Sequence, residues 1–484
     1  MDRFADLKRI LCSASVDFEE TLGHYLPENA QMHRLDAPIP QIVISPNSAW
    51  GVAKVLSALD QLGLYDEVAV SVRSGGHGYH NGASCDGIMI NLANLNNHFL
   101  HDDVLMLQPG VMIGHVISAL HQQGKALPHG DCFDVHAGGH FTTAGWDFIL
   151  TRKYGLGCQH VIAAKVVLWS GEVLSVDQNT HPDLFWAIKG GAAAEAGIVV
   201  ELTMRVFEAP PVATWRFKLL TRAEVEKCVA AQSLAKAHHL PREVSISFRI
   251  HFHPDHAGPV CSFNIFSLFP VAETLALIYE YLGDEVAELV NNLPAWNTGP
   301  LIDVRMIAGS DRLRADPGAI AEATSGKFRR DPLGFWEEGT AKREMEPSHF
   351  ATISNWTLPQ DRILLDLMVA FEAIKDLPIR WKTFALTTIG SGKMQELPTA
   401  LELGDGLSRF EIHWDADNHT DKRIAARFTD EISTIFERYK DPAPKRVYRG
   451  DIWQAEQAFD PRLEIIRKKY AKAPEGVYLL KQSA

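Results

Sequence analysis

The chain has no long basic run and no apolar stretch of membrane-spanning length. Its formal net charge is −13 over 484 residues. A nucleic-acid site needs positive side chains to meet phosphates, so this balance argues against nucleic-acid binding and against attachment to an anionic membrane. No apolar run approaches the ~18 residues of a transmembrane helix. The first ten residues contain acids and no apolar core, unlike a signal peptide, so we expect a soluble, intracellular protein.

Cysteine is sparse and shows no metal-binding spacing. The six cysteines form no C-x-x-C pair. No His-x-x-x-His helix or carboxylate cluster with ligand spacing stands out either, so no metal site is predicted. In an intracellular chain we expect reduced, mostly buried thiols, and we single out only Cys132, for the reasons given below.

Length and composition indicate a multidomain globular protein. The chain is 46% hydrophobic and 22% charged, and 484 residues correspond to two or three domains of ~150 residues each. The Pro210-Pro211 pair is the best single boundary. We therefore expect domains over residues 1–208 and 209–440, with a C-terminal segment, 441–484, that returns to the first. The sequence does not indicate an oligomeric state.

A glycine-rich segment carries most of the functional information. The apolar run 68–72 predicts a short buried strand, and Arg73-Ser74-Gly75-Gly76-His77-Gly78 follows it. Two glycines let the backbone turn sharply and approach a ligand closely. Exposed N–H groups can then hold a phosphate, with Arg73 adding positive charge. His77 places a nucleophilic imidazole beside that ligand, which suggests a bound dinucleotide with a reactive centre.

The segment VRSGGHGYHNGA resembles the pyrophosphate loop of flavoproteins in the vanillyl-alcohol oxidase and p-cresol methylhydroxylase superfamily, and more narrowly the berberine bridge enzyme-like branch. The resemblance implies FAD, joined covalently through its 8α-methyl group to His77. Residues 130–140 resemble the family stretch G-x-C-x-x-V-G-x-x-G-H, in which the cysteine bonds to flavin C6. Cys132 falls on that position, so the resemblance implies a bicovalent flavin.

Further motifs follow in family order over roughly residues 35 to 208. Residues 151–156 match R-x-x-G-L, which in the family runs near the adenine and ribose, and residues 182–199 are similar to DLFWALRGG…GIV. Besides the loop and Cys132, the resemblance assigns these residues to cofactor binding: Val135, Gly138, Gly139, His140, Gly155, Leu156, Gly197, Ile198 and Val199.

Three departures lie near the expected cofactor. The family's glycine run is here Ala192–Ala196, which would make that wall narrower and less flexible. His136 stands where the family usually has glycine, and Trp146-Asp147 replace small residues.

The expected fold class is α+β, with a p-cresol methylhydroxylase-type FAD-binding domain followed by an α/β substrate domain. Residues 1–34 look helical. From about 212 to 440, helical stretches alternate with strands such as 244–250 and 408–414. Their apolar–polar alternation predicts an antiparallel sheet with one covered face. In the family such a sheet roofs the flavin and forms the substrate pocket.

The catalytic base is the least determined feature. In the family it is usually a tyrosine of the C-terminal segment or an acid of the substrate sheet. Tyr448 is the candidate of the first kind, with Arg446 and Arg449 near in sequence to lower its pKa. Glu402, Glu411 and His413 are candidates of the second kind. Glu411 and His413 are two residues apart and share one sheet face, which could equally be a polar outer face.

The leading hypothesis is an FAD-dependent oxidase that passes electrons to dioxygen. Its substrate would be a small organic alcohol, amine or related secondary metabolite. Alternatives are a sugar or oligosaccharide oxidase, which the missing leader argues against, a flavin-containing cyclase or isomerase without net redox change, and a dehydrogenase using another acceptor. A binding module is disfavoured because covalent flavin anchors have no role in one.

Overall fold

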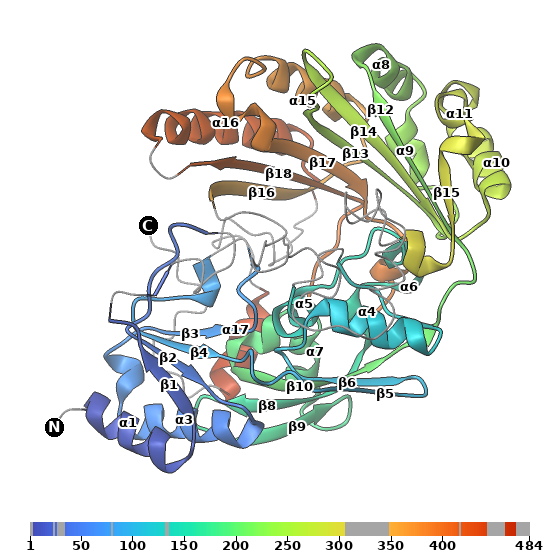
Figure 1. Ribbon diagram of the computed structural model, residues 1–484. Coiled ribbons are helices and arrows are strands. Elements are labelled where there is room, and N and C mark those ends of the chain that lie inside the picture. The colour runs from blue at the N-terminus through green and yellow to red at the C-terminus, as the bar shows by residue number, and fades with distance from the viewer. Residues whose placement is uncertain are drawn as a thin grey trace, which may run out of the picture.

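The computed structural model describes residues 3–22, 25–26, 34–78, 81–130, 135–304, 348–415, 418–442 and 460–470. Two halves of the molecule lie one above the other in Figure 1. The lower half contains two sheets built from residues before 206, and the upper half contains one large sheet covered on its outer side by helices. The predicted α+β class is confirmed.

The first lower sheet carries the glycine-rich loop. Its strand order is β1 (Asp17–Glu20), β2 (Ile42–Ser45), β4 (Ile88–Asn91) and β3 (Val70–Arg73). Strands β2, β4 and β3 are parallel, whereas β1 pairs antiparallel with β2. The helix α3 (Ala49–Gln61) follows β2, and the Ser48 side chain caps it by accepting from Gly51 N at 3.1 Å.

The N-terminal segment differs from its expected helical character. Among the described residues of this segment, 3–22, 25–26 and 34, the helix is α1 (Arg3–Ser13), and β1 follows it. The short strand forms because β2 offers it an edge to pair with, a tertiary effect that local propensity does not report.

The second lower sheet is antiparallel. Its strand order is β5 (His98–His101), β6 (Val104–Leu107), β10 (Gly197–Arg205), β8 (Val161–Leu168) and β9 (Val173–Asp177). The remaining elements of this half are α4 (Ile113–Gln122), α5 (Ala137–Thr143), α6 (Thr151–Tyr154), α7 (Pro182–Ile188), the 3-10 turns η1 (Leu64–Asp66), η2 (Asn81–Ala83), η3 (Gly157–His160) and η4 (Ala192–Glu195), and the paired short strands β7 (Lys125–Ala126) and β11 (Phe207–Glu208).

The upper sheet is antiparallel throughout, as the sequence predicts. Its order is β15 (Trp296–Gly299), β12 (Ala213–Leu220), β14 (Pro259–Ser267), β13 (Val244–Phe252), β17 (Thr383–Ile389), β18 (Gly406–Trp414) and β16 (His349–Thr357). The outer helices and turns are α8 (Arg222–Ala230), α9 (Ser233–Ala237), α10 (Val271–Leu282), α11 (Asp284–Val290), η5 (Leu293–Ala295), α15 (Arg362–Glu372), η6 (Pro378–Lys382) and α16 (His419–Arg438). The short turn η7 (Lys393–Gln395) lies in the connection between β17 and β18 and contacts α6 of the lower half.

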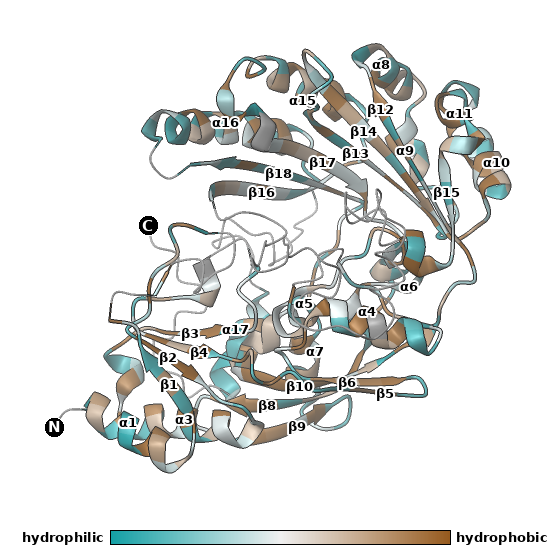
Figure 2. Cartoon of the chain, viewed as in Figure 1, coloured by the Kyte–Doolittle hydropathy of each residue, from teal (hydrophilic) through white to brown (hydrophobic). Residues whose placement is uncertain are grey.

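Alternation along the upper strands decides which face is covered. Ile246, Phe248, Phe410 and Ile412 join a buried apolar core with helices α15 and α16. Their neighbours in sequence therefore point to the opposite, inner face. Strands β8 and β10 of the lower half are coloured largely hydrophobic in Figure 2, whereas β18 shows hydrophilic stretches.

The inner face of the upper sheet lies against the lower half. Phe266 of β14 stacks on Phe148 with ring centroids 6.2 Å apart, and Trp356 of β16 lies 6.5 Å from Trp146. The C-terminal helix α17 (Pro461–Tyr470) also packs on the lower half, where the Tyr470 hydroxyl donates to Asp183 at 2.7 Å. Among the described residues, no helix combines the length and apolarity that crossing a membrane requires.

Candidate functional site

The glycine-rich loop leaves β3 at Arg73 and packs into the lower half. Gly75 and Gly76 are buried, and Gly76 has a φ of +73° that favours glycine. A Cβ on Gly75 would lie 2.0 Å from His136 Nδ1, so a side chain there has no room. Arg73 Nη1 donates to Asn91 Oδ1 of the neighbouring strand at 3.3 Å. At its two glycines the loop is therefore packed too closely, or turned too sharply, for a residue with a side chain, as the sequence predicts.

The beginning of α5 closes over this loop. A Cβ on Gly138 would lie 2.3 Å from Ser74 Oγ, whereas one on Gly139 would meet open space. Gly138 N donates to Pro109 O, and Val135 O accepts from Ile113 N at 2.8 Å. Two segments that the sequence analysis assigns to the cofactor, residues 74–78 and 135–140, are thus brought together.

His140 lies close enough to His77 for their charges to interact. Its Nε2 accepts from Gly130 N at 2.9 Å. Burial, and then the nearby His77, lower the pKa of His140 to about 3. The His140 ring is therefore neutral near pH 7 and, because Nε2 accepts, carries its proton on Nδ1.

Other predicted cofactor residues have visible packing roles. Gly155 has a φ of +99°, and a Cβ there would lie 2.7 Å from Gln159 Oε1. Leu156 N donates to the same oxygen at 2.7 Å. A Cβ on Gly197 would lie 2.2 Å from Val167 O, Ile198 is in the apolar core and Val199 packs on the edge of a neighbouring core. Their contact with the cofactor stays a prediction, and Cys132 and Tyr448 lie outside the described residues.

Arg152 joins the two halves. Its guanidinium donates to the carbonyls of Leu240, Pro241 and Val244 at the start of β13, with distances of 3.1 Å to Leu240 and 3.2 Å to Pro241. Burial, followed by the nearby Arg242, lowers its pKa to about 10. In this structure the arginine of the R-x-x-G-L motif contacts the upper half.

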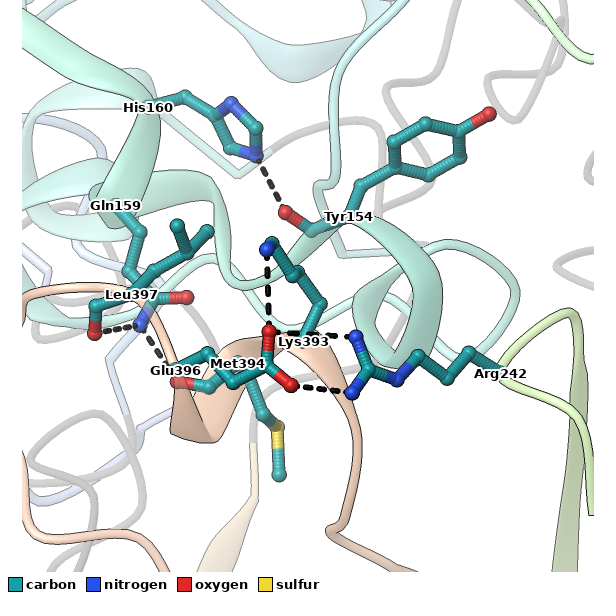
Figure 3. Close-up of polar contacts among 8 residues, drawn as sticks. All are labelled: Tyr154, Gln159, His160, Arg242, Lys393, Met394, Glu396 and Leu397. Carbon is teal, nitrogen blue, oxygen red and sulfur yellow. Dashed lines mark hydrogen bonds and ion pairs between the residues drawn. The ribbon is translucent and has the colours of Figure 1, made fainter.

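The connection between β17 and β18 also docks on the lower half, as Figure 3 shows. Gln159 Nε2 donates to Met394 O at 2.7 Å and to Leu397 O at 2.9 Å, and Glu396 binds Arg242 and Lys393. His160 Nε2 lies 3.1 Å from Tyr154 O, and burial lowers the pKa of His160 to about 4. The neutral His160 ring therefore donates from Nε2 to that carbonyl.

The turn that replaces the family's glycine run is left-handed. Ala192, Ala193, Ala194 and Glu195 have φ values of +49°, +55°, +54° and +57°. Glycine adopts this conformation without strain, whereas an alanine there is strained by about 1–2 kcal/mol. Trp169 Nε1 donates to Glu195 O at 2.8 Å and holds the turn in place. The expectation that this side of the cofactor pocket is narrower and less flexible stays a prediction, but the backbone has positive φ angles of the kind that glycine adopts readily.

A charged cluster lies on the inner face of β18. Arg409, Glu411 and His413 share that face, and Arg409 Nη2 donates to Glu411 Oε2 at 2.6 Å. His413 Nε2 lies 2.7 Å from Glu411 Oε1, and His413 Nδ1 lies 2.7 Å from Ser348 Oγ. Glu411 is only 1% exposed. The prediction that Glu411 and His413 share a face is thus confirmed, and that face is the inner one, against the lower half.

Glu411 is held ionised despite its burial. Burial alone would raise its pKa, but Arg409, the hydrogen bond from His413 and the charge of Arg249 together lower it to about 2. Ser348, Arg409 and Arg249 were not among the predicted site residues. The alternation of Arg409, Glu411 and His413 could have revealed the arginine, whereas Ser348 directly precedes β16 and Arg249 lies on β13.

Glu402 does not belong to this cluster by any contact described in the structure. It lies in the connection that precedes β18 and, after Asp460, contributes to raising the pKa of Arg462 on α17. Among the described residues, no group of three or more histidine, cysteine, aspartate or glutamate side chains could hold a metal ion.

The residues around the loop fit the FAD that the resemblance implies. Gly75 and Gly138 leave no room for a Cβ, Gly139 opens onto free space, and the neutral His140 adds no charge beside His77. Backbone of this kind can approach a pyrophosphate closely.

The comparisons with known proteins agree with this site. A family model described as "FAD binding domain" matches residues 40–177. A chitooligosaccharide oxidase of Gibberella zeae is 37% identical over 194 residues, 39% of this chain and 38% of that protein. A glucooligosaccharide oxidase of Sarocladium strictum is 32% identical over 251 residues, 50% of this chain and 48% of that protein. The chain thus spans less than half the length of these curated relatives.

Solved structures resemble the whole chain. A berberine bridge enzyme-like protein (number 28) from Arabidopsis thaliana has a TM-score of 0.79 at 17% identity, covering 99% of this chain and 100% of that one. A chitooligosaccharide oxidase structure has a TM-score of 0.77 at 20% identity, covering 99% and 100%. The predicted resemblance is confirmed: residues 40–177 match an FAD-binding domain, and the chain has the fold of the berberine bridge enzyme-like flavoproteins.

Proposed function

We propose that the protein is an FAD-dependent oxidase that oxidises an alcohol carbon of an oligosaccharide or another hydroxylated small molecule, with dioxygen as the electron acceptor. The observation that carries the proposal is the pairing of two features. The buried glycine loop with His77 and His140 lies in the lower half, and the ionised Glu411 with His413 lies on the sheet face that packs against that half. When bound, FAD supplies the acceptor for the C–H hydrogen and its electron pair.

Similar proteins favour a carbohydrate substrate. Relatives named chitooligosaccharide, xylooligosaccharide and glucooligosaccharide oxidase share 32–37% identity with parts of this chain. We therefore place a sugar substrate ahead of a non-sugar metabolite, the reverse of the order that the sequence alone suggested. Other relatives are named only as FAD-linked oxidoreductases, so a hydroxylated non-sugar stays the second choice within the same reaction class.

We propose covalent attachment of the flavin through His77 and Cys132. His77 supports this because it sits at the end of the loop, next to the neutral His140, which does not repel a developing positive charge on His77. Oxidation of an alcohol also needs a group that accepts the hydroxyl proton. Tyr448, Glu402, Glu411 and His413 stay candidates, and the structure brings Glu411 and His413 into one hydrogen-bonded cluster.

The first experiment tests whether the flavin is bound covalently, and it does not depend on enzyme activity. Purified protein is precipitated in acid, and the visible spectra of pellet and supernatant are recorded for the native chain and for His77→Ala, Cys132→Ala and the double variant. Yellow colour that stays in the native pellet and is released only from the double variant supports both links. Colour released from the native pellet refutes covalent attachment, and a colourless protein refutes the flavoenzyme proposal.

The second experiment tests the reaction. Oxygen consumption and hydrogen peroxide are measured with cellobiose, xylobiose, chitobiose and a panel of non-sugar alcohols. Peroxide formed in equal amount to the oxidised product supports an oxidase. Product formed without oxygen uptake would refute it and favour a cyclase or isomerase, and turnover only with an artificial dye would favour a dehydrogenase.

A further inference from the structure

We propose that Ser348, His413 and Glu411 form a proton relay, in which His413 Nδ1 takes the hydroxyl proton of the substrate through the Ser348 hydroxyl. The inference rests on the proposed alcohol oxidation. It assigns the proton acceptor to a histidine supported by a carboxylate, and it adds Ser348, whose part in the site no sequence motif indicates.

The hydrogen-bond order of the cluster fixes the direction of transfer. An ionised carboxylate only accepts, so the 2.7 Å contact between Glu411 Oε1 and His413 Nε2 requires a proton on Nε2. A ring that carries a single proton then has its lone pair on Nδ1. In that form Ser348 Oγ, 2.7 Å away, donates its proton to Nδ1. A hydroxyl already directed at an imidazole lone pair is the arrangement that general-base transfer needs.

Glu411 itself is a poor proton acceptor. Its pKa of about 2 means that its carboxylate binds a proton only weakly near neutral pH. Its fixed negative charge instead stabilises His413 once the ring becomes an imidazolium, and its hydrogen bond holds the ring in one tautomer. Glu411 is thus a positioning residue that acts through His413.

The charged groups around the ring come from several elements. Arg409 binds Glu411 from the same strand, and Arg249 on β13 also lowers the Glu411 pKa. His251, next on the inner face of β13, has a pKa lowered to about 4, chiefly by burial, so it is neutral near pH 7.

The segment before β2 supplies further charges near the ring. The Arg34 guanidinium lies 4.6 Å from the centroid of Phe350, whose ring is 5.3 Å from that of His413. Arg34 is paired with Asp36 at 2.8 Å, and His349 Nδ1 lies 3.8 Å from the same carboxylate. The Arg34–Asp36 pair is neutral overall, and Glu411 contacts the His413 ring directly.

The transfer balances in protons and electrons. The substrate O–H proton moves to Ser348 Oγ as the Ser348 proton moves to His413 Nδ1, so Ser348 ends unchanged and His413 gains one proton. The substrate carbon loses its hydrogen together with two electrons, and the C–O bond becomes a carbonyl. Dioxygen takes up those two electrons and two protons to give hydrogen peroxide, one of the protons being that returned by His413.

The kinetic test uses FAD-loaded protein and cellobiose, or whichever of the three disaccharides it oxidises fastest. We expect His413→Asn to lower kcat by about 10²–10⁴-fold, the usual range for losing a general base. Ser348→Ala should also lower kcat, whereas Ser348→Thr, which keeps the hydroxyl, should restore most of it. His101→Asn, an exposed histidine on β5, is the matched control and should behave like the native chain.

Glu411→Gln distinguishes positioning from a merely structural role. Glutamine can still accept from His413 Nε2 but removes the negative charge. The imidazolium then loses its stabilisation, so the acidic limb of log kcat/KM should move to lower pH. A normal melting temperature with an unmoved limb would overturn the assignment, as would a Ser348→Ala variant with native kcat.

Nuclear magnetic resonance measures the tautomer of the His413 ring in protein that is not turning over substrate. In [15N]histidine-labelled protein, the His413 signals are those lost in His413→Asn. We expect the singly protonated ring to carry its proton on Nε2. A singly protonated ring with its proton on Nδ1 would overturn the relay. If none of the alcohols is oxidised while the tautomer is as expected, the proposed function fails, and the proton-transfer role fails with it.

Discussion

Gln159 of the lower half donates a hydrogen bond of 2.7 Å to the carbonyl of Met394, which lies 235 residues later in the chain. The same amide nitrogen reaches Leu397 O at 2.9 Å, and its oxygen accepts from Leu156 N. One buried side chain thus satisfies three backbone groups, two of them from the connection between β17 and β18. An unpaired buried backbone group is costly, so this amide fixes the position of that connection.

Replacing Gln159 with leucine should destabilise the protein strongly. The change leaves two carbonyls and one N–H group without their partner, and we expect a loss of about 3 kcal/mol in the free energy of unfolding. Urea unfolding followed by tryptophan fluorescence measures it. Gln61→Leu, at an exposed position of α3, is the control and should change stability by less than about 0.5 kcal/mol. Equal effects at both sites would contradict the role given to Gln159.

Replacing Ala192 with glycine should stabilise the protein. Ala192 has a φ of +49° in the left-handed turn. Glycine removes strain of about 1–2 kcal/mol and adds backbone entropy to the unfolded chain, so we expect a net gain of about 0.5–1 kcal/mol. The matched control is Ala426→Gly, at an exposed position inside α16, where about 1 kcal/mol should be lost. Thermal melts of the two variants should therefore shift in opposite directions.

Stability should fall as the pH is lowered from about 6.5 to 4. Burial lowers the pKa of His140 to about 3 and those of His160 and His251 to about 4. In this window the three histidines bind protons in the unfolded chain but not in the folded chain, so the free energy of unfolding rises with pH. Each such group changes it by at most about 1.4 kcal/mol per pH unit. The contribution is complete above pH 6.5 and lost as the pH falls toward the folded values.

Urea unfolding at several pH values checks this prediction. His160→Gln should reduce the slope of stability against pH, because glutamine does not titrate while its amide can still donate to Tyr154 O. His101→Gln, an exposed histidine, should leave the slope as it is. A flat profile between pH 4 and 6.5 in the native chain would contradict the assignment of neutral buried rings.

Alanine at Gly75 should prevent flavin binding. The new Cβ would collide with the His136 ring, at 2.0 Å from Nδ1. The loop or the start of α5 must then move, and we expect a large fall in the 450 nm absorbance per mole of protein. The double variant Gly75→Ala with His136→Gly should recover part of the flavin, since it removes the ring that collides. No recovery, with the fold intact by circular dichroism, would mean that the cofactor itself excludes the methyl group.

Local patterns in the sequence predicted the elements that build the flavin site. Residues 70–72 of the apolar run lie in β3, and Gly76 takes the positive φ expected of a loop glycine. Alternation placed Glu411 and His413 on one face of β18. These features depend on residues close together in the chain, where periodicity and turn chemistry are informative.

The features that the sequence did not reveal depend on tertiary pairing. Ser348 reaches His413 only because β16 lies beside β18, and Arg249 approaches Glu411 from β13. Arg152 was assigned near the nucleotide on motif grounds, yet its donors meet carbonyls of the upper half. The left-handed turn at Ala192 could not be predicted from local propensity, because the surrounding packing determines the backbone there.

The docking of the connection between β17 and β18 matters for anyone who recombines this chain with a relative. A chimera that exchanges the upper sheet at the predicted Pro210-Pro211 boundary would separate residues 390–405 from the surface of the lower half that they contact. Gln159, Lys189 and Trp186 of the lower half all bond to that connection. Functional hybrids should therefore inherit residues 390–405 from the parent that supplies the flavin domain, even though this stretch is flanked on both sides by strands of the other.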